Sequence, residues 1–226
     1  MKIRLIIPIT GLNHQAITQR LNFLNTIKSP ETTLDYTQVR EGPPSIESEA
    51  DAVLAGPDIL RLVKEAEEDG VDAAIIWCGD DPALHAAREL VDIPVVGPGE
   101  SMRSISLTLG SKPVRVVPGI PVLEMRRDLD RTINALKEII QLNLSRGTGD
   151  TFYLGCLALF GLGGKLRDAL GVPILDGAEA SLMTAETLVK LHLKHSRITY
   201  PKKNIDITSY HLPEKNNKYF PPVHRY

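Results

Sequence analysis

The chain has 226 residues with 42% hydrophobic side chains, enough to bury the core of one large domain or two small ones. A net charge of −2 provides no electrostatic basis for binding nucleic acid or a membrane surface, so we expect a small molecule as its partner. No apolar run approaches the roughly 20 residues of a membrane span, and the first residues enter a strand without a signal-peptide pattern. We therefore expect a cytoplasmic protein with two free thiols rather than a disulfide.

In the first half of the chain, buried strands alternate with helices. Apolar runs predict strands over residues 3–9, 33–39 and 71–77, and a fourth strand near Val95. Helices are expected over residues 14–25, over 50–54 continuing at 58–69, and over 83–90. This alternation predicts a parallel sheet with right-handed crossovers.

The second half is shorter and more often interrupted by glycine and proline. A helix is expected over residues 102–109, followed by two short strands over 114–117 and 122–125. From Asp128 a helix, a strand and another helix lead to Leu175, and a final helix is expected over residues 181–195. Residues 196–226 are rich in aromatic and basic side chains, which is typical of a flexible end or of an arm that docks on a partner or a second subunit.

The stretch from Cys78 to Pro82 organises the front half. It follows a buried strand, and Asp81 and Pro82 are suited to the N-cap and first position of the next helix. Because ligands of open α/β sheets bind beyond the carboxyl ends of the strands, Cys78 is a candidate nucleophile or base. A buried cysteine that serves only in packing is the alternative.

A second copy of this arrangement surrounds the other cysteine, Cys156. Again an apolar strand ends at a cysteine, and a helix then leads to a proline, Pro94 16 residues after Cys78 and Pro173 17 residues after Cys156. An amphipathic helix closed by a glycine precedes each strand. The sequence therefore predicts two similar α/β halves, each with a thiol at a strand end.

Polar groups near these strand ends are candidates for substrate contacts. Thr10 lies in the turn after the first strand, and Ser45 lies in the Gly-Pro-Pro loop, where it can instead cap the next helix. Ser48 can also reach the crevice. Neither a metal-ligand pattern nor a lysine suited to a pyridoxal Schiff base is evident, so we expect no cofactor and no metal.

Four segments carry a resemblance to known proteins, namely residues 42–49 (GPPSIESE), 78–82 (CGDDP), 94–100 (PVVGPGE) and 154–156 (LGC). Together they resemble the aspartate/glutamate/hydantoin racemase superfamily, and its hydantoin and allantoin racemase branch in particular. The resemblance implies an α/β fold of two similar domains, each a small parallel sheet flanked by helices and related by a pseudo-two-fold repeat. It also implies an active site in the cleft between them and cofactor-independent racemase or epimerase activity, with Cys78 and Cys156 on opposite faces of the substrate.

The resemblance suggests domain limits of residues 1–98 and 99–180, with residues 181–226 forming a helix that returns to the first domain and the tail. Three departures from the family pattern stand out. Isoleucines at positions 7 and 9 replace the two asparagines of an Asn-Pro-Asn-Thr turn. The aromatic and basic tail has no counterpart, and a strand-helix unit is missing after Gly110. Its absence would leave one wall of the cleft open, or require the tail or another subunit to fill it.

Paired thiols suit the inversion of a carbon acid, because one can act as base while the other donates a proton. Their ordinary pKa near 8.5 allows one thiolate and one thiol near neutral pH. The amides that follow each cysteine are expected to stabilise a thiolate or bind substrate, namely those of Gly79, Asp80, Leu157 and Ala158. Because no cation was evident beside either cysteine, we expect the helix dipoles to activate them.

The preferred substrate from this reasoning is a 5-substituted hydantoin, whose C5–H is acidified by the adjacent carbonyl. Three alternatives remain open at this point. The chain can be an Asp/Glu-type amino-acid racemase, a related enzyme that uses one thiol, or a catalytically lapsed relative that binds a small molecule or assembles with itself. A homo-oligomer, formed through the tail, is also expected.

Overall fold

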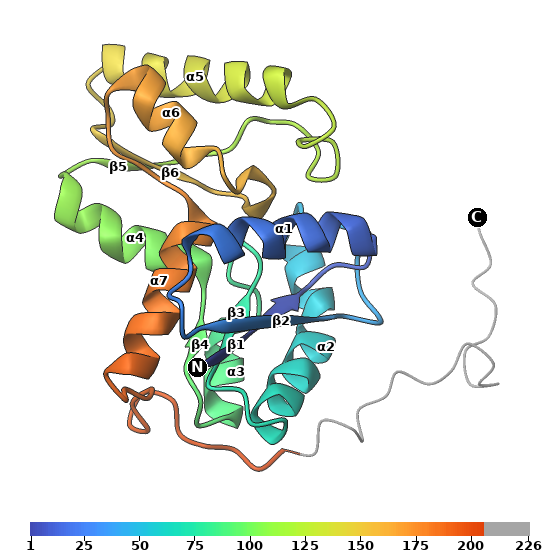
Figure 1. Ribbon diagram of the computed structural model, residues 1–226. Coiled ribbons are helices and arrows are strands. Elements are labelled where there is room, and N and C mark those ends of the chain that lie inside the picture. Colours follow the sequence, from blue (N-terminus) through green and yellow to red (C-terminus); the bar gives the residue numbers. More distant parts are fainter. Residues whose placement is uncertain (206–226) are drawn as a thin grey trace, which may run out of the picture.

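The computed structural model describes residues 1–205, which form two parallel sheets with helices packed around them (Figure 1). The first sheet has the strand order β2-β1-β3-β4, and the second has the order β5-β6-β7. The strands of the two sheets are β1 (Lys2–Ile7), β2 (Thr33–Gln38), β3 (Ala73–Ile76), β4 (Val95–Val96), β5 (Pro113–Val116), β6 (Thr151–Leu154) and β7 (Ile174–Leu175). The expected α/β fold of two small parallel sheets is therefore present.

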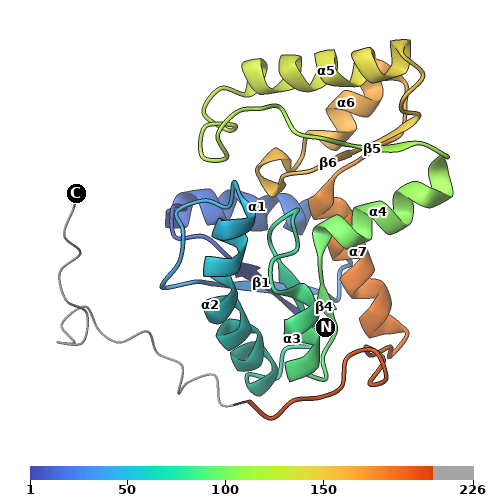
Figure 2. The ribbon, with the colours of Figure 1, turned by 180° about the vertical axis from the view of Figure 1, so that it is seen from behind.

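Helices connect successive strands, as right-handed crossovers between parallel strands require. They are α1 (His14–Ile27), α2 (Glu49–Glu68), α3 (Leu84–Leu90), α4 (Pro98–Leu109), α5 (Leu129–Ser145), α6 (Gly163–Leu170) and α7 (Gly177–Lys190). Helix α4 leads from the first sheet to the second. Helix α7 packs beside α4 and leads back to the first sheet (Figure 2). Helix α1 lies on the side of the first sheet that faces the second half of the molecule (Figure 1).

Each half has its own hydrophobic core. In the first, Ile3 and Leu5 of β1 and Ile75 of β3 are fully buried, and β3 is apolar on both faces, as expected for a central parallel strand. Ala178 and Leu182 of α7 join this core, although they lie far away in the sequence. The second core gathers around fully buried side chains of α5 and β6.

The second sheet has no counterpart of the central strand β1 within the described residues. Strand β2, which precedes the long helix α2, is an edge strand beyond β1. Strand β5 precedes the long helix α5 in the same way, but it pairs directly with β6. In the second sheet, β5 therefore occupies the position next to β6 that a counterpart of β1 would have. This arrangement agrees with a strand-helix unit missing after Gly110.

Several predicted boundaries are wrong, for local physical reasons. Residues 122–125 form a turn after Pro121 rather than a strand, because the amides of Glu124 and Met125 donate to the Pro121 carbonyl. Helix α2 runs through Pro57 without a break, since its apolar face is buried on the sheet on both sides of that residue. Its N-cap is Ser48, whose hydroxyl accepts from the Asp51 amide at 3.2 Å, and not Ser45.

Helices α4 and α7 begin earlier than predicted, and α7 ends earlier. Pro98 occupies the first turn of α4, where its missing N–H is not needed. Asp176 caps α7 by accepting from the Ala178 amide at 3.0 Å, and the helix ends at Lys190 instead of His195. The predicted span of residues 181–195 is therefore displaced toward the C-terminus.

Residues after α7 run back along α3 of the same chain. Arg197 donates to the Arg88 carbonyl at 2.9 Å and pairs with Asp92, and the Lys203 amide donates to the Glu89 carbonyl. The first part of the predicted tail thus docks on its own chain. The remainder, residues 206–226, lies outside the described residues, and the tail-mediated assembly stays a prediction.

No helix within residues 1–205 combines the length and the apolar character that a membrane crossing requires.

Candidate active site

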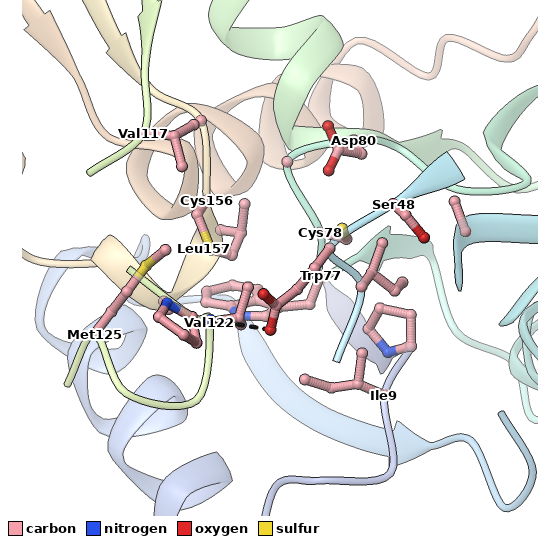
Figure 3. Close-up of a pocket in the computed structure, with 18 of the residues that line it drawn as sticks. Ile9, Ser48, Trp77, Cys78, Asp80, Val117, Val122, Met125, Cys156 and Leu157 are labelled. Carbon is pink, nitrogen blue, oxygen red and sulfur yellow. Dashed lines mark hydrogen bonds between the residues drawn. The ribbon is translucent and has the colours of Figure 1, made fainter. Parts of the chain in front are cut away.

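Both cysteines line one cavity of about 810 Å³ between the two sheets (Figure 3). Cys78 lies two residues after the end of β3, and Cys156 lies two residues after the end of β6, so the two halves present their thiols from equivalent places. Figure 3 shows Cys156 on the side of the second sheet and Cys78 on the side of the first. The carboxyl ends of β1 and β5 also border this cavity, which therefore occupies the crevice where α/β sheets bind ligands.

Two glycines bring the cysteine loops into direct contact. A Cβ atom added at Gly79 would lie 2.3 Å from the carbonyl oxygen of Gly155 and 3.4 Å from the amide nitrogen of Cys156. Asp80 and Arg115 add an ion pair of 2.5 Å across the same junction, and Arg115 also donates to the Gly155 carbonyl at 2.9 Å. The two cysteine backbones are thus held close at one edge of the cavity.

Six of the eight residues predicted for the site line this cavity, and two do not. Those present are Cys78, Gly79, Asp80, Cys156, Leu157 and Ala158. Thr10 is exposed, and its hydroxyl donates weakly to the Pro43 carbonyl at 3.3 Å. Ser45 donates to Glu47 at 2.8 Å. The Thr10 hydroxyl thus contacts the loop after β2, and the Ser45 hydroxyl contacts its own loop. Neither residue lines the cavity, and their contacts with a substrate stay a prediction. Ser48, which caps α2, does line the cavity.

The helix predicted to follow Cys78 is displaced. Asp81 has a φ of +53° and does not cap α3; its carboxylate accepts instead from the amides of Gly99 and Glu100 at 2.8 and 2.7 Å, and so caps α4. Helix α3 begins only at Leu84, and Cys156 is followed by one 3-10 turn. Single amides therefore stabilise the sulfur atoms, that of Asp80 for Cys78 and that of Ala158 for Cys156, and the expected role of helix dipoles is wrong.

Burial raises the pKa of both thiols, but their charged neighbours differ. For Cys78, loss of hydration is the largest cause, and the carboxylates of Asp80 and Asp81 raise the pKa further. For Cys156, loss of hydration and Asp80 also raise the pKa, whereas Arg20 and Arg115 lower it. Contrary to expectation, cations do act on one of the cysteines, and Cys156 has the more favourable surroundings for a thiolate.

Arg20 is a site residue that the sequence interpretation missed. It lies on the buried face of α1, with Ile17 and Leu24 three and four residues away, and it is only 4% exposed. The signal for it in the sequence is a basic residue at a position that the helical period places between apolar residues. Trp77, whose side chain is 5% exposed, both joins the core and lines the cavity.

The cavity wall on the side of the second sheet is largely apolar. It is formed by the segment after β5 and by the start of the loop that leads to α5, with Val117, Ile120, Pro121, Val122 and Met125 among its residues. This segment therefore lines the cavity on the side of the second sheet, where the strand-helix unit is missing. Within residues 1–205, histidine, cysteine and carboxylate side chains do not gather in a group of three suited to a metal ion.

Comparison with known proteins agrees with this architecture. Residues 14–117 match the family model described as Asp/Glu/Hydantoin racemase. A hydantoin racemase of Pseudomonas sp. (strain NS671) is 32% identical, covering 90% of this chain and 93% of that protein. Its alignment spans 234 positions, more than the 226 residues of this chain, so that protein contains residues that this chain lacks.

Two solved structures share the fold over nearly their whole length. Allantoin racemase from Klebsiella pneumoniae superposes with a TM-score of 0.81 and 26% identity, covering 90% of this chain and 94% of that one. Allantoin racemase from Pseudomonas fluorescens gives a TM-score of 0.83 at 24% identity, covering 91% and 98%. The sequence match, the two-domain fold and the two thiols at equivalent strand ends lead to one conclusion: the chain belongs to the Asp/Glu/hydantoin racemase family of isomerases.

Proposed function

We propose that the chain is a cofactor-independent racemase of a small carbon acid of the 5-substituted hydantoin type, with Cys78 and Cys156 as its acid/base pair. The observation that carries this proposal is that both thiols, each two residues beyond an equivalent strand, line one cavity. The hydantoin racemases among the relatives support the substrate class. A cavity of about 810 Å³ has room for a five-membered ring with a substituent.

In the proposed reaction, one sulfur enters as a thiolate and removes the proton from C5, whose electron pair moves into the adjacent carbonyl to give an enolate. The other sulfur, a thiol, then donates its proton to the opposite face of C5. The product is the enantiomer, and the two sulfurs have exchanged their protonation states. Each cysteine is therefore base in one direction and acid in the other.

We assign the first thiolate to Cys156. Arg20 and Arg115 favour its ionised form, while Asp80 and Asp81 favour the neutral form of Cys78. The amides of Asp80 and Ala158, aimed at the sulfurs, also lie where they can stabilise negative charge that develops on the substrate.

The decisive experiment incubates one enantiomer of 5-benzylhydantoin in heavy water with the wild-type protein. Racemisation should occur, and the product enantiomer should carry deuterium at C5. Cys78→Ser and Cys156→Ser should each abolish inversion while leaving the fold intact. If one variant keeps the full rate, its cysteine is outside the mechanism and a one-thiol reaction is favoured. If the wild type inverts neither this hydantoin nor an acidic one, the racemase proposal falls in favour of a lapsed binding protein.

A further inference from the structure

Arg20 stands apart from the other buried arginines because it has no carboxylate partner among residues 1–205. Arg4 pairs with Asp35 and Asp69, and Arg88 pairs with Glu100. Arg20 is as buried as these, but within residues 1–205 no carboxylate lies within ion-pair distance of it. Its Nη1 donates to the Ala16 carbonyl at 2.6 Å, and its Nε has no acceptor among the described residues.

The neighbours of the Arg20 guanidinium do not neutralise its charge. Its Cζ lies 5.2 Å from the ring centroid of Phe160, and Arg126 approaches the same ring at 3.8 Å. Burial and the repulsion of Arg126 lower the pKa of Arg20 to about 10, which leaves it protonated at neutral pH. A buried cation without an anion is costly, because the lost hydration is not replaced by an ion pair.

Arg20 also borders the cavity that holds the two thiols. Three carboxylates line the cavity, those of Glu47, Glu49 and Asp80, and none of them forms an ion pair with Arg20. Glu47 accepts from the Ser45 hydroxyl at 2.8 Å and the Val122 amide at 3.3 Å, and Asp80 pairs with Arg115. An anion for Arg20 can therefore come from a molecule that enters the cavity, or from Cys156 when it is ionised.

We propose that Arg20 binds a carboxylate on the substituent of the substrate, so that this enzyme acts preferentially on hydantoins with an acidic side chain. The proposal rests on the proposed racemase function. A guanidinium matches a carboxylate in shape and charge, and such charge-assisted hydrogen bonds are stronger than those to a neutral amide. The apolar wall formed by Val117, Ile120 and Val122 offers no competing anion.

The test compares two substrates of nearly equal shape, 5-(2-carboxyethyl)hydantoin and 5-(2-carbamoylethyl)hydantoin. For the wild type we expect kcat/KM to favour the carboxylate by on the order of 10- to 100-fold, the range of one charge-assisted hydrogen bond at a buried site. Arg20→Met should remove this preference, mainly through a higher KM for the carboxylate. Arg20→Lys, which keeps the charge, should restore part of it.

The double variant Arg115→Met/Asp80→Asn is the matched control. It removes the other cation that acts on Cys156, which is half-exposed and paired with Asp80, and the second change avoids leaving the Asp80 carboxylate unpaired in the cavity. Any general effect on the thiolate changes both substrates alike and cancels in their ratio, so this double variant should keep the preference. If Arg20→Met slows both substrates equally, Arg20 serves Cys156 or the enolate, and the proposal is overturned.

Three outcomes separate the inference from the proposed function. A wild type that racemises both hydantoins equally well keeps its function and refutes the role of Arg20, whether or not the variants fold. If only 5-benzylhydantoin is racemised, the function holds and the inference is refuted. If neither these two hydantoins nor 5-benzylhydantoin is racemised, the function fails, and thermal stabilisation decides the inference. The carboxylate should then raise the Tm of the wild type more than the amide does, and equal shifts refute the inference.

Discussion

The contact between the two cysteine loops predicts a large effect from one methyl group. In Gly79→Ala the new Cβ would lie 2.3 Å from the Gly155 oxygen and 2.9 Å from its carbonyl carbon, where real Cβ contacts are not shorter than 3.0 Å. Both partner atoms belong to the backbone, so no side-chain rotation relieves the clash. The loops must separate by at least about 0.7 Å, the difference between the two distances.

The expected cost to stability is moderate. Overpacking of this kind destabilises a folded protein by about 1–3 kcal/mol. The loss of catalysis should be greater, because a displacement of about 1 Å between reacting groups can reduce a rate about 100-fold. We therefore expect kcat/KM for hydantoin inversion to fall by roughly 10- to 100-fold in Gly79→Ala, with the folded state still fully populated at 25 °C.

Gly164→Ala provides the matched control. This glycine lies in the first turn of α6, outside the cavity, and its added Cβ would meet only the flexible Arg167 side chain at 3.7 Å. It should stabilise the protein by up to about 1 kcal/mol, the helix preference for alanine over glycine, and leave the rate unchanged. Chiral chromatography measures inversion, and urea titration measures stability. A Gly79→Ala variant with the wild-type rate would refute the close apposition of the loops.

Other expectations follow from the charges around the site. Since burial raises the pKa of both thiols, kcat/KM should rise from pH 6 to pH 9, and a maximum near pH 5 would contradict this. Because cations favour the thiolate of Cys156 alone, iodoacetamide should modify Cys156 before Cys78, as peptide mass mapping can show. Asp81→Ala removes two hydrogen bonds to the first turn of α4 and should lower the free energy of unfolding by about 1–2 kcal/mol. Asp81→Asn should lower it less, because asparagine tolerates the positive φ of this position. Burial raises the pKa of Asp176 to about 6, so the native state binds this proton more tightly than the unfolded chain. Its contribution to the free energy of unfolding should fall by about 2 kcal/mol as the pH rises from 4 to 6. Urea titrations that show a smaller pH slope in Asp176→Ala would support this.

The parts of this site that the sequence could predict are those that depend on local pattern. Apolar runs mark β3 and β6 because both faces of a parallel strand are buried. Cys78 and Cys156 then fall two residues beyond the strand ends in both halves, and the repeat made them a pair before any geometry was known.

The parts that could not be predicted depend on contacts between distant segments. Asp81 has the sequence context of a cap for α3. Its carboxylate instead accepts from two amides of α4, 18 and 19 residues further on. Arg20 is 136 positions before Cys156 in the sequence, and its place in the cavity follows from how α1 packs between the halves. Pro57 is tolerated inside α2 because tertiary burial of that helix outweighs the lost hydrogen bond.

The shortened second half and the unpaired Arg20 are connected by the architecture of the cavity. Without a counterpart of β1, the second sheet brings β5 directly beside β6, and the wall above it is closed by Val117, Ile120 and Val122. These side chains offer no hydrogen-bond donors to a substrate, so the polar recognition that a central strand could have supplied must come from elsewhere. Helix α1 of the first half supplies it, because it is the element whose unneutralised cation reaches the same cavity. The paired acidic and neutral hydantoins measure directly whether this buried arginine provides the polar recognition that the apolar wall does not.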